Sequence, residues 1–188
     1  MKKICFILSC LFITLSCSSF NVKKSLLNPV YVTNTNKVSL MPVNAIKDSV
    51  ENYQMFEGRF ADSSFSSLLY LCADNTRIDV LMLNEFGLEM GWIGYDGITA
   101  ELNSSVFPKN LKCEYIILDL QNVYADSVLL KNHYENAGLL FEEMFMNEKK
   151  YRYIKKKNTV IEEIIISKEQ IVIKNFLRNY EYKLTICE

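Results

Sequence analysis

Two stretches of alternating apolar and polar residues, one in each half of the chain, constrain the fold more than any other feature. The first covers residues 53–102 and the second covers residues 149–187, and short polar or glycine-containing segments interrupt both. Alternation places every second side chain on the same face of a β-strand, and closely spaced turns return the chain antiparallel to itself. Each stretch therefore predicts an antiparallel meander.

The first meander has a clear apolar face. Ile78, Val80 and Met82 share one face of a predicted strand, and Leu88, Met90 and Trp92 are predicted to continue that face on the next strand. Asp96–Gly97 follows and predicts a type I′ hairpin, because Asp-Gly supplies the positive φ angles that this turn requires. The predicted strands are 55–60, 67–73, 77–83, 88–92 and 98–102.

Between the meanders, the apolar spacing changes from period two to that of a helix. Helices are predicted over 109–121 and 124–131, and residues 139–145 form either a third helix or the lead into the next strand. The second meander then has strands at 149–156, 160–167, 170–176 and 180–187. This order predicts the α+β class, in which helices lie on one face of an antiparallel sheet.

The N-terminus has the pattern of an export signal. Lys2 and Lys3 precede twelve uncharged residues, and Ser16-Cys17 follows them. Twelve residues are too short for a transmembrane helix, which needs about 20. The segment that ends at Cys17 resembles the lipobox of bacterial lipoproteins. The resemblance implies that residues 1–16 are a signal peptide and that Cys17 is the lipid-attachment residue, anchored in membrane lipid by its acyl chains.

Residues 17–52 lack clear periodicity and are predicted to be the lipidated N-terminus and a tether that ends in a short helix over 43–52. Residues 53–188 are predicted to form the domain. The cysteines of that domain are Cys72, Cys113 and Cys187. Three cysteines allow at most one disulfide, and their spacing fits no metal motif. The favoured interpretation is three small hydrophobic side chains, with one bridge as the alternative.

Several segments resemble a family of small outer-membrane lipoproteins that carry a domain of unknown function and are associated with aryl-polyene pigment gene clusters. The resemblance covers residues 53–188, and it rests on the order and spacing of short segments. These segments are Leu83-Asn84-Glu85-Phe86-Gly87, Ile93-Gly94-Tyr95-Asp96-Gly97, Phe107-Pro108-Lys109-Asn110-Leu111, Ile117-Leu118-Asp119-Leu120-Gln121 and the hairpins over 151–186.

Such proteins are similar to LolA and LolB, the periplasmic carrier and outer-membrane receptor of lipoproteins. The resemblance implies a curved antiparallel half-barrel sheet whose helices cap one face and enclose an apolar cavity for acyl chains. The residues then expected to line the cavity are Val80, Met82, Leu88, Met90 and Trp92. Ordinary core packing of the same side chains is the alternative.

The sequence has no pattern that indicates catalysis, a bound cofactor or a metal site. It lacks a phosphate-binding glycine loop and a nucleophile elbow, and its one histidine, His133, is expected in a polar loop. Glu162 and Glu163 are neighbours on a predicted strand and therefore point to opposite faces. We do not expect an enzyme, and the net charge of −1 gives no reason to expect nucleic-acid binding.

A dense basic run, residues 149–157, is the one strong local charge asymmetry. A solvated hairpin edge is the favoured interpretation, and contact with anionic lipid headgroups is the alternative. The function expected from the whole sequence is a lipoprotein held at the outer membrane and facing the periplasm, which binds acyl chains or accepts lipid or lipoprotein cargo. An envelope interaction module that binds no small ligand is the rival hypothesis.

Overall fold

A computed structural model of the chain describes residues 25–60, 63–104, 107 and 111–187. Within these residues, one antiparallel sheet of eleven strands has the order β1-β8-β7-β6-β5-β4-β13-β12-β11-β10-β9. Its strands are β1 (Ser25–Leu26), β4 (Val50–Phe60), β5 (Ser63–Ala73), β6 (Ile78–Leu83), β7 (Glu89–Tyr95), β8 (Thr99–Ser104), β9 (Leu140–Met146), β10 (Lys149–Lys156), β11 (Thr159–Ile166), β12 (Gln170–Asn175) and β13 (Tyr180–Ile186). The two end strands do not pair with each other, so the sheet stays open.

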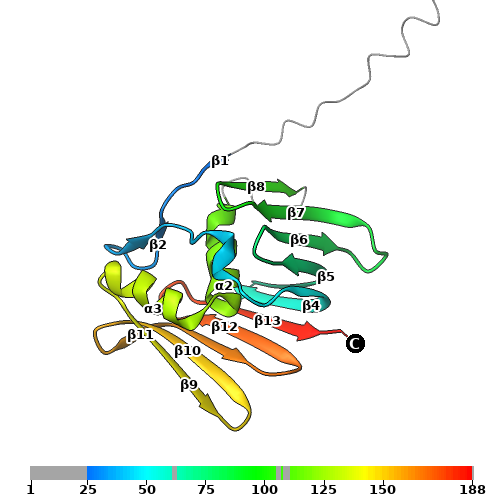
Figure 1. The fold of residues 1–188 in the computed structure, drawn as a ribbon. Coiled ribbons are helices and arrows are strands. Elements are labelled where there is room, and N and C mark those ends of the chain that lie inside the picture. The colour runs from blue at the N-terminus through cyan, green and yellow to red at the C-terminus, as the bar shows by residue number, and fades with distance from the viewer. Residues whose placement is uncertain (1–24, 61–62, 105–106, 108–110, 188) are drawn as a thin grey trace, which may run out of the picture.

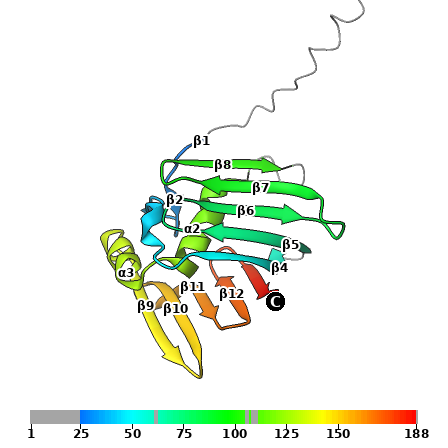
Figure 2. The ribbon, with the colours of Figure 1, turned by 45° about the vertical axis from the view of Figure 1, so that its right-hand side comes forward.

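The two predicted meanders are both present, and they join in the middle of the sheet. Strands β4–β8 form the first and β9–β13 form the second, and β4 pairs with β13 in antiparallel register from Phe60↔Tyr180 to Gln54↔Ile186. Figures 1 and 2 show that the strands of the two meanders run in clearly different directions, as expected for a strongly twisted sheet. The predicted α+β class and the open, half-barrel arrangement agree with this topology.

Two helices lie between the meanders in sequence, α2 (Cys113–Tyr124) and α3 (Ser127–Asn136). Figure 2 shows α2 behind strands β4–β8, against one face of the sheet, which we call the inner face. Helix α2 buries Ile117, Leu118 and Val123. The carboxylate of Asp126 caps α3 by accepting hydrogen bonds from the backbone N–H groups of residues 128 and 129, which would otherwise lack partners.

Three local expectations need correction. Of the two alternatives for residues 139–145, the third helix is wrong, because the chain there forms strand β9 (Leu140–Met146). The short helix expected over 43–52 is a single 3₁₀ turn, η1 (Val43–Ala45), and β4 begins at Val50. Gly97 has a φ of 90°, but Asp96 does not have a positive φ, so Asp96–Gly97 does not form the expected type I′ turn. The hairpin is closed instead by the carboxylate of Asp96, which accepts from the backbone N–H groups of Ile98 and Thr99.

Residues 30–46 are part of the folded core, which corrects the tether predicted over 17–52. This segment contains the small hairpin of β2 (Val30–Tyr31) and β3 (Lys37–Val38). Its apolar side chains pack beside α2 and are buried: Val30, Val32, Val38, Leu40, Met41, Val43, Ala45 and Ile46. The side-chain amide of Gln121 fixes it to α2 by accepting from the Met41 N–H at 3.0 Å and donating to the Met41 carbonyl at 2.6 Å.

The basic run of residues 149–157 is not a solvated sheet edge. Most of it forms β10, which lies between β9 and β11. Arg152 is 3% exposed and donates from Nη1 to the carbonyls of Asn122 and Val123, both at 2.8 Å. Its Nε donates to Glu143 at 2.7 Å. The guanidinium therefore satisfies carbonyl groups at the C-terminal end of α2, a position that favours positive charge.

Candidate functional site

The residues predicted to line a cavity do not share one surface. Val80 and Met82 lie on the inner face, where they are 7% and 4% exposed and belong to the continuous core. Leu88 lies in the turn between β6 and β7 and is 63% exposed. The expectation that all five residues continue one face is therefore wrong, and ligand binding by Val80 and Met82 stays a prediction.

Trp92 lies on the outer face of the sheet, opposite to Val80 and Met82. The register pairs Val80 with Ile93 and Leu81 with Trp92, so Ile93 is the residue of β7 that continues the inner face. Met90 is the extra residue of a β-bulge, because Met82 pairs with Gly91 and the next pair is Leu83 with Glu89. Met90 is half-buried and packs against the core. Cys17 lies outside the described residues.

A cluster of aromatic rings covers one end of the inner face, and we call it the aromatic cluster. It consists of Phe56, Phe60, Phe65, Tyr180 and Tyr182, from strands β4, β5 and β13. Neighbouring ring centroids are 4.7–5.9 Å apart. Phe56 is buried, whereas Phe60 and Phe65 are each 39% exposed. The cluster thus extends the apolar core to an accessible apolar surface.

Gly58 allows the rings to meet across the middle strand. It lies between Phe56 and Phe60 on β4 and pairs with Phe65 on one side and Tyr182 on the other. A Cβ atom at Gly58 would come within 2.9 Å of Cε1 of Phe65 and 3.0 Å of Cζ of Phe56. The absent side chain therefore provides the space that the rings occupy, a common reason for glycine within a strand.

A buried polar network adjoins the aromatic cluster beneath α2. The hydroxyl of Tyr180 contacts both carboxyl oxygens of Asp119 at 3.0 Å. Glu162 of β11 accepts from the side-chain amides of Asn122, at 2.9 Å, and Asn175, at 3.0 Å. Asn122 in turn accepts from the hydroxyl of Tyr134 at 2.6 Å. The network ties both helices to the second meander.

Both acids of this network are expected to hold their protons more tightly than usual. Burial raises the pKa of Asp119 well above its ordinary value, and the nearby Glu162 raises it further, while the Tyr180 hydroxyl opposes the shift. Burial also raises the pKa of Glu162, against the amides of Asn122 and Asn175. Both side chains are at most 5% exposed, which is more typical of a structural pair than of groups that meet a substrate.

The remaining candidate chemistry is sparse in the part of the chain that the structure describes. No group of three or more His, Cys, Asp or Glu side chains there has the geometry to hold a metal ion. Cys72 is half-buried, Cys113 is buried and Cys187 is exposed. His133 lies in the last turn of α3, half-buried, and burial lowers its pKa. The expected polar loop around it is therefore wrong.

Among the described residues, no helix has the length and apolar character needed to cross a membrane. The class that the fold defines is an open antiparallel sheet with helices on its inner face. The chain belongs to the family described as "Protein of unknown function (DUF3261)", which it matches over residues 51–188. No curated protein matches the chain.

Sequence reasoning missed the aromatic cluster as a unit and the acids beneath α2. The alternation of Phe56, Gly58 and Phe60 was visible, but their neighbours on β13 come from the far end of the chain. Asp119 and Glu162 carried no local signal of burial, because isolated acids on a helix or strand usually face solvent. The glycine flanked by two phenylalanines was the one signal that pointed to this end of the sheet.

Proposed function

We propose that this protein is a membrane-anchored lipoprotein of the cell envelope that binds acyl chains, alone or as part of lipid or lipoprotein cargo. The proposal places Cys17 in the outer membrane through its lipid and the domain in the periplasm. It also includes a LolA/LolB-like role for the open sheet. The N-terminal signal supports export and lipid attachment, and the aromatic cluster supports an apolar ligand.

The single observation that carries the proposal is the exposure of the aromatic cluster. Phe60 and Phe65 are stacked with an interplanar angle of 8° and are each 39% exposed, although the rings beside them join the core. Burying apolar surface contributes about 25 cal/mol per Å², so an acyl chain laid on these rings gains by leaving water. The ligand site of the proposal is thus this end of the inner face, rather than the positions around Trp92.

A charge placed on the cluster tests the site. Phe60→Asp should reduce uptake of a fluorescent fatty acid at least tenfold in a soluble form that lacks residues 1–17. The fold should survive, because a carboxylate at a partly exposed position can stay hydrated. Phe86→Asp is the matched control, since Phe86 is 78% exposed in the β6–β7 turn, away from the cluster. Equal loss of uptake in both variants would exclude the cluster as the site.

Lipid attachment is tested separately. Cys17→Ala should abolish incorporation of radiolabelled palmitate and leave the protein either soluble or as an uncut precursor. Cys10→Ala is the control, because Cys10 also follows a Leu-Ser pair but lies too near the lysines to end a full apolar region. Palmitate on the Cys17→Ala protein at the wild-type level would disprove the anchor.

A second candidate function, an envelope interaction module without a small ligand, is favoured by strand β9. This strand ends the sheet, and its side chains Met144, Phe145 and Met146 are 47%, 74% and 52% exposed. Exposed apolar edge strands are sites at which another chain can pair. A photo-crosslinker at position 145 that captures an envelope protein, together with purified protein free of fatty acid and phospholipid by mass spectrometry, would favour this function.

A further inference from the structure

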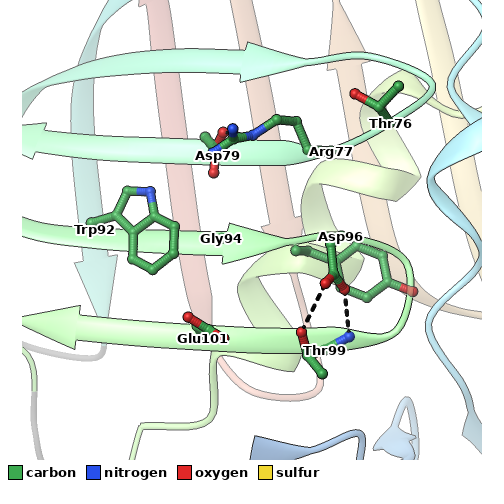
Figure 3. A pocket seen from close by; sticks show the side chains of 9 residues that line it. Thr76, Arg77, Asp79, Trp92, Gly94, Asp96, Thr99 and Glu101 are labelled. Carbon is green, nitrogen blue, oxygen red and sulfur yellow. Dashed lines mark hydrogen bonds and ion pairs between the residues drawn. The ribbon is translucent and has the colours of Figure 1, made fainter. Parts of the chain in front are cut away.

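A pocket of about 270 Å³ lies on the outer face of the first meander, on the side of the sheet away from α2. Strands β6, β7 and β8 supply its walls, and Trp92 and Gly94 of β7 lie in the middle (Figure 3). This pocket shares no residue with the aromatic cluster. Any ligand bound here is therefore independent of the acyl-chain site proposed above.

The indole ring of Trp92 forms an aromatic surface within the pocket because Gly94 has no side chain. Gly94 pairs with Asp79 on one side and with Glu101 on the other, so these three positions form one row across the strands. The ring of Trp92 lies over Gly94, and a Cβ atom there would collide with the ring carbons. Figure 3 shows Trp92 on β7, with Asp79 on the strand to one side and Glu101 on the other.

The charged groups around this ring are predominantly acidic. The lining contains the carboxylates of Asp79, Asp96 and Glu101 and the guanidinium of Arg77, which gives a net charge of −2. Arg77 forms an ion pair with Asp79, so this cation is largely neutralised within the pocket. The hydrogen bonds that Asp96 accepts from Thr99 and Ile98 lower its pKa and keep it ionised.

Glu101 is the acid that is best placed to meet a ligand. It is half-buried next to Gly94 in the row across the strands. No other side chain among the described residues forms an ion pair or a hydrogen bond with it. The other two acids already have partners, Arg77 for Asp79 and the backbone of the β7–β8 turn for Asp96. One carboxylate beside an aromatic face thus remains for a cation.

We propose that this pocket binds an ammonium group, either of a free amine or of a zwitterionic lipid headgroup, with the cation over the Trp92 ring and Glu101 as its counter-ion. A cation within about 6 Å of a tryptophan ring is attracted by the negative face of the ring, and tryptophan is the strongest of the aromatic partners. The net negative charge disfavours anions, and the polar walls disfavour an acyl chain. The same chemistry suits primary and quaternary ammonium groups.

The chain contains a single tryptophan, so its tryptophan fluorescence reports on this pocket alone. The full chain in a polyoxyethylene detergent is titrated with choline and, in parallel, with 3,3-dimethylbutan-1-ol, which has the same shape without the charge. Choline should change the fluorescence saturably, and the neutral alcohol should need at least a tenfold higher concentration. Glu101→Gln should weaken choline binding about tenfold, whereas Glu89→Gln, on the neighbouring strand β7 but outside the pocket, should leave it unchanged.

Gly94→Ala provides a second variant, because it displaces the ring without changing any charge. Choline binding should be lost while the melting temperature changes little; Glu101→Gln decides the question if this variant does not fold. Vesicles of phosphatidylcholine and of phosphatidylglycerol separate the two sources of the ammonium group, since a headgroup site responds to the first vesicles only. Equal responses to choline and its neutral analogue, or unchanged choline binding in Glu101→Gln, would overturn the proposal.

Discussion

Strands β4–β8 and strands β9–β13 follow the same up-and-down plan, yet the inner faces of these two meanders differ in what they bury. The first meander presents Leu71, Ile78 and Val80 to the helices, and its buried polar residues, Gln54 and Ser67, are uncharged. The second buries Arg152 and Glu162 among its isoleucines.

The free energy of apolar contacts depends little on their direction, whereas buried charges need particular partners at particular distances. The first meander is therefore held mainly by burial of apolar area. The second is fixed against α2 by hydrogen bonds that one arrangement alone satisfies. This difference predicts that substitutions in the two meanders will differ both in magnitude and in their dependence on pH.

The largest expected effect comes from removing the segment that packs beside α2. Deleting residues 18–46 removes eight buried apolar side chains from the core, and full burial of each large one is worth about 1.5–3 kcal/mol. The sum is comparable with the whole 5–15 kcal/mol of a typical domain, so the truncated protein should not fold cooperatively. Circular dichroism during heating measures this. A truncated protein that melts within a few degrees of the intact one would restore the tether interpretation.

The next largest effect is expected at the buried cation of the second meander. Arg152→Met should cost about 3–5 kcal/mol, because it removes the cationic partner of Glu143 and leaves two carbonyl groups of α2 without their donor. Arg59→Met is the control: Arg59 is exposed, and its ion pair with Glu181 is worth about 1 kcal/mol or less. Urea unfolding of both variants compares them, and equal losses would contradict the special role of Arg152.

The third prediction concerns pH. The pKa values of Asp119 and Glu162 are raised in the folded protein, so the folded state keeps protons that the unfolded state releases above about pH 4. The free energy of unfolding should therefore fall as the pH rises from about 4 through neutrality. Asp119→Asn should flatten this decline, with a gain at pH 8 of about 1.4 kcal/mol for each unit of pKa elevation removed. A decline as steep as in the wild type would contradict the assignment.

The smallest effect is expected in the first meander. Ile78→Val removes one methylene from a fully buried position and should cost about 0.5–1.5 kcal/mol. Among the described residues, the strands of the first meander contain no buried acid whose protonation could change the cost. The cost should therefore be the same at pH 5 and pH 8. Parallel urea titrations at the two pH values measure it. A cost that changes with pH would mean that the two meanders are energetically coupled through α2.

The strands and helices were largely predictable because their signals are local. Alternation and turn residues located β4–β8 and β10–β13 within a few residues. Residues 30–46 were not recognised as core because their burial depends on α2, about 80 residues further along the chain. No local periodicity reports such a contact.

The face of β7 was misjudged for a different reason. Met90 and Trp92 alternate as well as Ile93 and Tyr95 do, so the sequence of this strand fits either face. Pairing with β6 places Ile93 and Tyr95 on the inner face, and the β-bulge accommodates Met90 as an extra residue. Likewise, the partners of Glu162 come from α2 and β12, which a view of β11 alone cannot supply.

The pairing of β4 with β13 has a consequence for how quickly the protein folds. Arg59 and Glu181, which meet across these strands, are 122 residues apart in sequence. Contacts between residues so far apart require the ends of a very long loop to meet, so chain entropy is lost before any of these contacts stabilises the protein. Proteins dominated by such contacts fold in milliseconds to seconds rather than microseconds. During synthesis, which begins at the N-terminus, the centre of the sheet cannot close until strand β13 has been made. Until then, β4 is a long strand with one unpaired edge, to which other chains or a chaperone can bind.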